Sequence, residues 1–415
     1  MGRKMEYAKL RAGLREKVQE RLDFRRDYTD EEVEEIIEEV LLESNDLTTL
    51  TVRQRRSLQK EIFDSLRRLD ILQAFVEDHN VTEIMINGKD RIFVEEDGRL
   101  RELEEHFESQ EKLRDVIQQI VAGCNRVVNE ASPIVDARLA DGSRVNVVMD
   151  PVALGGPIVT IRRFPEHPFT MEGLLRNGSI TQEAADFLKK LVRAKYNIFI
   201  SGGTGSGKTT FLNVLSGFIP GDERIITIED SAELQIQGIR NLVRLETRNS
   251  NVEGCGEITI RDLIRASLRM RPDRIVVGEV RGAEALDMLQ CLNTGHDGSL
   301  STGHANSSRD MLLRLENMVL MAVELPLAAI RQQIASGLDV IVHLGRLRDK
   351  SRKVLEIVEV LGYENNEIKL APLYRFVEED FREGKVVGQL RKEGVLRNTD
   401  KLRTAGLCEE RVEAG

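Results

Sequence analysis

The chain has 415 residues, of which 41% are hydrophobic and 31% are charged, a composition typical of a globular protein with about two to four domains. Its net charge of −10, its aromatic content of 4% and its lack of Trp count against nucleic acid as the main partner, because such proteins usually carry basic patches and base-stacking aromatics.

Membrane and redox signals are also missing from the sequence. No apolar run approaches the ~20 residues of a membrane span. The N-terminus has no apolar signal-peptide core, and Glu6 breaks the myristoylation pattern. The four cysteines are scattered without a CxxC pair, which indicates neither a zinc site nor a disulfide framework. We expect a cytoplasmic protein.

Residues 1–75 are expected to form an N-terminal helical segment. Thr29 and Glu32 fit a capping box that opens a helix. The apolar residues that follow share one helix face: Val33, Ile36, Ile37, Val40 and Leu41. We interpret the segment as a small solvated bundle, with partner docking as the alternative.

Residues 76–164 are expected to form a smaller α+β domain. Its predicted elements are a hairpin of strands 81–87 and 91–98, a helix at 110–121, and strands at 143–149 and 158–162. Four arginines lie near its end: Arg138, Arg144, Arg162 and Arg163. Each would by default be solvated or paired. The Pro- and Gly-bearing residues 165–180 are interpreted as a linker.

The strongest signal in the chain is a strand, a Gly-rich loop and a helix in sequence. Ile198–Ile200 is a buried strand pattern, residues 202–209 fit G-x-x-x-x-G-K-[ST], and an apolar helical pattern follows. Backbone N–H groups of such a loop converge on phosphate oxygens. The predicted nucleotide-binding residues are Gly203, Thr204, Gly205, Ser206, Gly207, Lys208, Thr209 and Thr210. A chance match is the alternative, and the flanking strand and helix count against it.

Lys208 can reach the β- and γ-phosphates of ATP, and the Thr209 hydroxyl can ligate Mg²⁺. Further strands and helices alternate after the loop, which predicts a parallel α/β sheet in residues 181–345. Ligands of such sheets bind at the carboxyl ends of the strands.

Acidic residues and a histidine stand at three further strand ends. Glu229 and Asp230 follow one strand, Glu279 another, and His304 a third. We assign Glu279 to the attacking water, Glu229 and Asp230 to the Mg²⁺ shell, and His304 to the γ-phosphate. His296 stands a little upstream, and a structural role for it remains as open as a functional one.

Other patterns are interpreted structurally. Arginines between 261 and 274 resemble a nucleic-acid stripe, but without interleaved aromatics we favour ion pairs. The Met- and Leu-rich stretch 311–320 is interpreted as core. Residues 346–415 are expected to form a C-terminal β-hairpin, turning at Asn365-Asn366, and a charged tail.

Four motifs in this order resemble those of the type II/IV secretion ATPases, and most closely the CpaF-type ATPases of Flp/Tad pilus assembly. They are GGTGSGKTT, TIEDSAEL, VVGEVRG and TGHDGSLSTGHAN, and the resemblance spans roughly residues 70–400. It implies a homohexamer of RecA-like ATPase domains (α/β, parallel-rich sheet), each preceded by an N-terminal domain whose arginines meet ATP.

The resemblance also implies site residues and partners. Arg144 and Arg162 match the family's phosphate-contacting arginines best, with Arg138 and Arg163 less well. Glu279 falls on the catalytic glutamate and Glu229 on the aspartate-box glutamate. Such rings work at the cytoplasmic face of the inner membrane against a platform protein and move pilin subunits.

Two departures matter. Gly278 stands where ordinary Walker B motifs have an Asp, a feature that the family shares and that leaves the Mg²⁺ ligands beyond Thr209 open. The four-cysteine zinc module of many type II relatives is missing from this sequence. The main hypothesis is a pilus or secretion motor; the alternatives are a nucleic-acid translocating ATPase and a nucleotide-gated scaffold.

Overall fold

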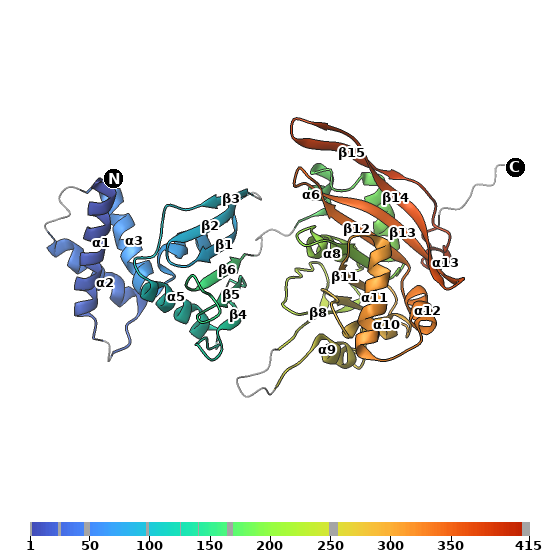
Figure 1. The fold of residues 1–415 in the computed structure, drawn as a ribbon, viewed down its shortest axis with the longest axis horizontal. Helices are drawn as coiled ribbons and strands as arrows, with labels where there is room; N and C mark the ends of the chain where they lie inside the picture. The colour runs from blue at the N-terminus through green and yellow to red at the C-terminus, as the bar shows by residue number, and fades with distance from the viewer. Residues whose placement is uncertain are drawn as a thin grey trace. The chain divides into compact units, whose positions relative to one another are not determined.

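The computed structural model describes residues 2–23, 26–44, 50–96, 99–124, 126–139, 141–163, 169–248 and 256–408. The chain forms two compact units, an N-terminal unit (Met1–Glu166) and a C-terminal unit (His167–Gly415). Figure 1 colours the first from blue to teal and the second from green to red. Each unit has hydrophobic clusters of its own.

The N-terminal unit begins with helices. They are α1 (Gly2–Arg21), α2 (Asp30–Glu43), α3 (Val52–Arg67), the short 3₁₀ helix η2 (Asp70–Leu72) and α4 (Gln73–Glu77). Thr29 and Glu32 form the predicted capping box, and Thr51 and Gln54 form a second one at α3. The apolar faces of α1, α2 and α3 pack on one another around Val18, Ile37 and Ile62. The predicted helical bundle is therefore present.

A six-stranded antiparallel sheet follows, in the order β3-β2-β1-β6-β5-β4. Its strands are β1 (Val81–Asn87), β2 (Arg91–Glu96), β3 (Arg99–Glu102), β4 (Ile134–Arg138), β5 (Arg144–Val148) and β6 (Ile158–Arg162). The helix α5 (Gln110–Gly123) contributes Leu113, Ile117 and Val121 to the same core as the sheet. Residues 97–98, the expected end of the hairpin, lie outside the described residues.

The C-terminal unit is built on a nine-stranded sheet, in the order β15-β14-β13-β12-β7-β11-β10-β8-β9. The parallel strands are β7 (Ile198–Gly202), β8 (Arg224–Glu229), β9 (Asn241–Glu246), β10 (Arg274–Val277), β11 (Leu300–His304) and β12 (Val340–Arg346). The antiparallel strands are β13 (Arg352–Glu364), β14 (Glu367–Arg382) and β15 (Lys385–Lys392). This arrangement confirms the predicted α/β class.

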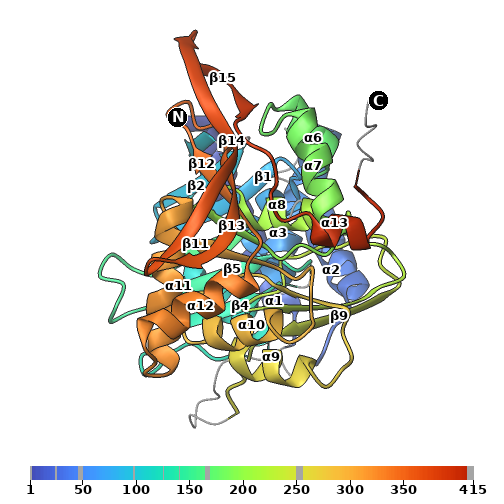
Figure 2. The same cartoon turned by 90° about the vertical axis from the view of Figure 1, so that its right-hand side faces the viewer.

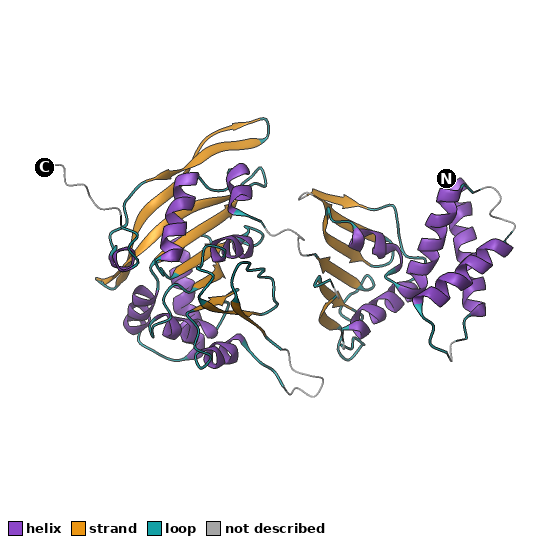
Figure 3. Cartoon of the chain, turned by 180° about the vertical axis from the view of Figure 1, so that it is seen from behind, coloured by secondary structure: helices purple, strands orange, loops and turns teal. Residues whose placement is uncertain are grey.

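Helices cover both faces of that sheet (Figure 3). On one face lie α6 (Met171–Arg176), α7 (Gln182–Arg193) and α8 (Lys208–Ser216). On the other lie α9 (Ile260–Ser267), α10 (Glu284–Leu292), α11 (Ser308–Ala322) and α12 (Leu327–Gly337). Figure 2 shows α6 and α7 on the opposite side of the sheet from α11 and α12. The short helix α13 (Asp400–Thr404) is the last helix in the described residues.

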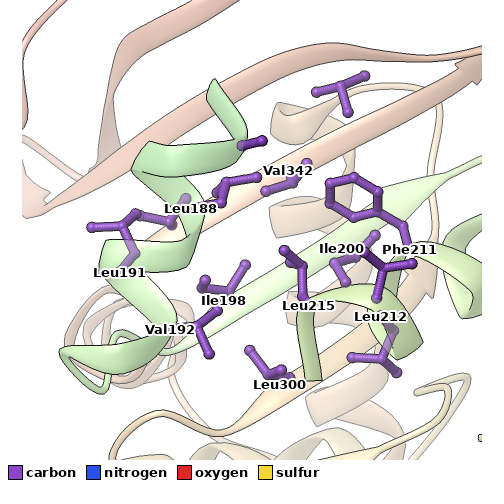
Figure 4. Close-up of a cluster of buried hydrophobic side chains, with 14 of the residues drawn as sticks. Leu188, Leu191, Val192, Ile198, Ile200, Phe211, Leu212, Leu215, Leu300 and Val342 are labelled. Carbon is purple, nitrogen blue, oxygen red and sulfur yellow. The ribbon is translucent and has the colours of Figure 1, made fainter. Parts of the chain in front are cut away.

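The core beneath the Gly-rich loop explains how that loop is held. Figure 4 shows Ile198 and Ile200 of β7 packed among Leu188, Leu212 and Leu215 of α7 and α8. Because β7 is buried along its whole length, the loop that follows it starts from a fixed point.

Two boundaries differ from the sequence expectation. The expected linker 165–180 contains α6, whose Met171 and Leu174 are buried in the core; its prolines at 165 and 168 lie outside the described residues. In place of the expected C-terminal hairpin, three strands, β13 to β15, extend the main sheet. The sequence did not predict this extension, because charged side chains along β14 and β15 obscure the alternation of apolar and polar residues. The predicted turn at Asn365-Asn366 is present, with positive φ at both residues.

Cys124, Cys291 and Cys408 are free thiols, and Cys255 lies outside the described residues. No helix in the described part of the chain is both long enough and apolar enough to cross a bilayer.

Candidate active site

The Gly-rich loop joins β7 to α8 and folds back against β12. Gly205 and Gly207 have φ of +68° and +92°, values that side chains with a Cβ rarely adopt. A Cβ on Gly202 would lie 2.5 Å from Ser206 Oγ and 2.6 Å from the Leu344 carbonyl oxygen. Glycine is therefore required where the loop leaves β7. Ser206 Oγ is buried and has no hydrogen-bond partner among the described residues, which suits an incoming phosphate oxygen.

Lys208, the first residue of α8, points back along this loop. Its Nζ donates a hydrogen bond to the Gly203 carbonyl oxygen at 3.1 Å and lies 3.2 Å from His304 Nδ1. Burial lowers the pKa of Lys208. Burial, followed by the nearby Lys208 charge, lowers the pKa of His304, so the imidazole is neutral at pH 7.

Glu279 completes a series of contacts at the carboxyl edge of the sheet. Its Oε1 lies 2.8 Å from His304 Nε2, and its Oε2 accepts a hydrogen bond from Arg281 Nη2 at 2.8 Å. Oε1 accepts no hydrogen bond of good geometry in the described residues, so it keeps a lone pair for a further donor. The fold thus brings together Lys208, His304 and Glu279, which are far apart in sequence.

Glu229 ends β8 and is only 2% exposed. Its Oε1 accepts hydrogen bonds from the backbone N–H groups of Glu233 and Leu234, at 2.8 and 2.9 Å. Burial raises its pKa to about 7, against the smaller lowering by those two bonds. A Cβ on Gly278 would lie 2.9 Å from Glu229 Cγ. The glycine that replaces the usual Walker B acid therefore leaves room for the side chain of Glu229.

Asp230 is one of the side chains predicted to hold Mg²⁺. Asp230 Oδ1 accepts a hydrogen bond from Thr247 Oγ1 at 3.0 Å, and its Oδ2 lies 3.6 Å from Arg281 Nη1. No group of three or more His, Cys, Asp or Glu in the described residues is arranged to hold a metal ion. Glu229 Oε2 is buried without a hydrogen-bond partner, and the Thr209 hydroxyl lies in the first turn of α8. These few donors suit Mg²⁺, which takes phosphates and waters as most of its ligands.

Three of the four singled-out arginines stand in one row across the sheet of the N-terminal unit. Arg138 pairs in register with Arg144, and Arg144 with Arg162. Side chains alternate between faces along a strand, and the adjacent Val145 and Ile161 are in the core. The three arginines therefore lie on the face away from the core. Glu83 of β1 pairs in register with Arg162 and lies 3.9 Å from its Nη2, so the row also contains a carboxylate.

Arg163 has a local role instead. Its Nη1 donates to the carbonyl oxygens of Asp78 and Val81 in the same unit. His296 likewise takes no part in the contact series at the sheet edge. Its carbonyl oxygen accepts a hydrogen bond from Ser299 Oγ at 2.8 Å, and its Nδ1 is buried without a hydrogen-bond partner in the described residues.

Two residues of the C-terminal unit's site were not predicted. Arg281 donates a hydrogen bond to Glu279. The sequence contained a signal for this residue, because Arg281 lies two positions after Glu279 in the VVGEVRG motif. Arg352 donates a hydrogen bond from Nε to the Gly205 carbonyl oxygen at 2.9 Å. No motif marks Arg352, because it lies 147 residues from the loop.

A cavity of about 440 Å³ opens beside these groups. The loop residues Gly203 and Thr204 and the imidazole of His304 line one part of it. Arg314 and Asn317 of α11 line another. The cavity reaches the sheet edge at His304, the residue that contacts both Lys208 and Glu279.

Comparison with known proteins identifies the family. The family model described as type II/IV secretion system protein matches residues 66–390. The chain belongs to this family. The RecA-like fold, the phosphate loop and the family together make it an ATPase, as the sequence predicted.

Curated relatives carry names from two kinds of system. The chain is 36% identical over 293 residues to a putative conjugal transfer protein of Mycobacterium tuberculosis, covering 69% of this chain and 83% of the relative. It is 31% identical over 332 residues to the conjugal transfer protein TrbB of Rhizobium radiobacter, covering 79% and 98%. It is 31% identical over 315 residues to the type IV secretion system protein PtlH of Bordetella pertussis, covering 70% and 93%.

Among solved structures, the Yersinia pseudotuberculosis ATPase DotB matches with a TM-score of 0.52 at 16% identity, covering 72% of this chain and 80% of that one. The Legionella pneumophila DotB matches with a TM-score of 0.50 at 20% identity, covering 72% and 81%. At these identities the likeness supports the fold alone.

Proposed function

We propose that this chain is the protomer of a homohexameric motor that hydrolyses ATP to power pilus assembly or protein secretion, in the manner of a CpaF-type ATPase. The observation that carries the proposal is the contact series Lys208–His304–Glu279 beside the phosphate loop. A cation for phosphate, a neutral imidazole and a carboxylate with a free lone pair are what hydrolysis requires at one place.

In this mechanism the loop N–H groups and Lys208 bind the β- and γ-phosphates. Glu279 Oε1 accepts a hydrogen bond from the attacking water and orients it toward the γ-phosphate. Arg281 holds the other carboxylate oxygen, so the carboxylate keeps one orientation. His304, neutral and within 3.2 Å of Lys208, donates its one ring N–H to an oxygen of the γ-phosphate, which is a hydrogen-bond acceptor at neutral pH.

Thr209 would hold Mg²⁺ together with the phosphates, and Glu229 and Asp230 would contribute to its shell, Glu229 through the unpartnered Oε2. The metal supplies neutralisation of the charge on the phosphate oxygens. Asp230 is already 3.6 Å from Arg281, so its contribution requires a change of partner.

The arginine row supplies the remaining positive charge in this proposal. Arg144 and Arg162 bind phosphate oxygens of ATP, with Arg138 beside them in the same row. Guanidinium groups bind phosphate oxygens through charge-assisted hydrogen bonds, and ATP would compete with Glu83 for Arg162.

The resemblance supports the proposed partners. The ring acts at the cytoplasmic face of the inner membrane on a platform protein, and a pilin or secreted protein is moved indirectly. Closure of subunits around ATP is the step that transmits force. Nucleic acid is not required as a substrate.

A second candidate is a motor of a conjugal transfer apparatus that acts on DNA. The names of the relatives from Mycobacterium tuberculosis and Rhizobium radiobacter favour it. The net charge of −10 and the scarcity of aromatic residues count against direct DNA handling.

The test is steady-state ATPase activity of the purified chain against its oligomeric state, with and without DNA. We expect Mg²⁺-dependent turnover that rises as hexamers form and does not respond to DNA. Glu279→Gln should lower kcat by about 10²–10⁴-fold, the usual contribution of a general base, while ADP still binds.

The matched control is Glu364→Gln, at an exposed glutamate that ends β13, which should leave kcat unchanged. Unaltered turnover in Glu279→Gln would overturn the assignment and favour a nucleotide-gated scaffold. Strong stimulation by DNA with a steep salt dependence would favour the second candidate.

A further inference from the structure

The hairpin between β12 and β13 brings a basic side chain to the outer side of the phosphate loop. β12 runs parallel to β7 up to the pair Leu344 and Gly202, where the loop begins. The chain then turns and returns as β13, whose first residue, Arg352, pairs with Arg346. Arg352 Nε donates to the Gly205 carbonyl oxygen at 2.9 Å.

The start of β13 is firmly anchored. Lys353 Nζ donates to the carbonyl oxygen of Gly178 at 2.7 Å, and the Val354 N–H donates to that of Ser179 at 2.9 Å. Asp349 in the turn accepts hydrogen bonds from the N–H groups of Ser351 and Val386. The Arg352 side chain thus extends from a backbone that is fixed on both sides.

The hydrogen bond to Gly205 sets the direction of the next N–H group. In a planar trans peptide the C=O and the following N–H point in opposite directions. Because Arg352 holds the Gly205 oxygen from outside, the Ser206 N–H points into the loop, where it now donates to the Gly203 oxygen at 3.3 Å. Gly203 also accepts from Lys208, so the Ser206 N–H faces the space in which phosphate oxygens are bound.

We propose that Arg352 is a positioning residue for nucleotide binding: it fixes the Gly205–Ser206 peptide so that the Ser206 N–H is ready for a phosphate oxygen. The inference rests on the proposed nucleotide site and adds a residue outside its motifs. Arg352 acts through the loop, without touching the nucleotide, so its contribution is to the affinity for the phosphates that ADP and ATP share.

The test compares Arg352→Gln with Arg346→Gln in the full-length chain. Both changes remove one exposed cation from the same strand pair, and the structure gives Arg346 no side-chain hydrogen bond or ion pair in the described residues. Affinities for ADP and for a non-hydrolysable ATP analogue are measured by calorimetry, together with kcat, KM and the melting temperature of the free protein.

We expect Arg352→Gln to weaken both nucleotides by the same factor, roughly five- to tenfold for one lost hydrogen bond from a charged donor. KM for ATP rises accordingly and kcat stays within about twofold of wild type, as expected when an interaction common to ground and transition states is lost. Arg346→Gln should behave as wild type. Arg352→Lys, which keeps the charge and a donor, should regain part of the affinity.

Equal affinities in Arg352→Gln and Arg346→Gln would overturn the inference. So would a loss confined to the ATP analogue, which would make Arg352 a direct γ-phosphate ligand. If Arg352→Gln melts at a lower temperature than wild type, its affinities are measured well below that melting temperature, and wild-type affinity under those conditions overturns the inference. Failure of wild type to bind either nucleotide would instead overturn the proposed function.

Discussion

At the scale of single residues, the position of the Glu229 side chain depends on the glycine at position 278. The Cγ of Glu229 occupies the space that a side chain at position 278 would need, and the N–H groups of Glu233 and Leu234 donate hydrogen bonds to Glu229 Oε1. The atypical Walker B of this chain is thus a packing requirement, which a motif comparison reports only as a missing Asp.

The buried carboxyl makes stability depend on pH. The pKa of Glu229 is raised from 4.5 to about 7 by burial. The folded chain therefore keeps a proton that the unfolded chain releases between these values, and stability falls as pH rises through this window. Glu229→Gln removes this dependence. As pH rises from 4.5 to about 7, the free energy of unfolding of wild type should fall by about 3 kcal/mol relative to that of the variant.

Urea unfolding of both proteins at several pH values checks this expectation. Glu364→Gln is the control, because it makes the same chemical change at an exposed carboxyl outside the core. A constant difference for Glu229→Gln would show that the buried carboxyl keeps the same ionisation in the folded and unfolded chains.

At the scale of elements, the junction of β7, the loop and β12 decides whether the loop can form. The Gly202 position is closed by the Leu344 carbonyl oxygen, which would lie 2.6 Å from a Cβ there, whereas a Cβ on Gly203 would meet nothing within 4 Å. Backbone atoms cannot move aside cheaply, so neighbouring glycines of one motif differ in what they tolerate.

Gly202→Ala should therefore lower the free energy of unfolding by about 1–3 kcal/mol and weaken ADP binding. Gly203→Ala should change stability by no more than about 0.5 kcal/mol. Thermal melting and ADP titration of the two variants check the pair. Equal effects at both positions would mean that the loop does not depend on its contact with β12.

The elements themselves were predictable to different degrees. Capping at Thr29, the strand at Ile158 and the β7–loop–α8 succession follow from local patterns, and each is present. The neighbours of β7 were not predictable, because β11 and β12 pair with it from about 100 and 140 residues away in the chain. Arg352 was missed for the same reason, since register across strands decides what reaches the loop.

At the scale of the whole molecule, the chain separates into two units whose hydrophobic clusters do not share residues. The phosphate loop and Glu279 lie in the C-terminal unit, and the arginine row lies in the N-terminal unit. The sequence predicted residues for both units, but the row itself became visible only through the pairing of β4, β5 and β6.

This division predicts the behaviour of the C-terminal unit alone. A fragment of residues 167–415 should fold and bind ADP as the full chain does, because its clusters are complete. Its ATP turnover should fall by about 10³-fold or more if the arginines stabilise the charge on the γ-phosphate in the transition state. Circular dichroism, ADP titration and ATPase assays check this expectation.

Full-length Arg144→Ala and Arg162→Ala variants are the controls for the fragment, since they remove the charges and keep the unit. Their turnover should fall toward that of the fragment. Full activity of either the fragment or these variants would exclude the arginine row from catalysis.

The contact of Lys208 with Gly203 has a consequence for the timing of the cycle. The Gly203 carbonyl already takes the hydrogen bonds that Lys208 and Ser206 would give to phosphate. The loop therefore carries an internal competitor for its own ligand. This competition lowers the affinity of the loop for every phosphate. The hydrogen bonds to the Gly203 carbonyl oxygen form again as ADP leaves, and they therefore lower the free-energy cost of product release, a step that often limits turnover. A motor that must pass repeatedly through an empty state gains speed from a site that binds less tightly than it could.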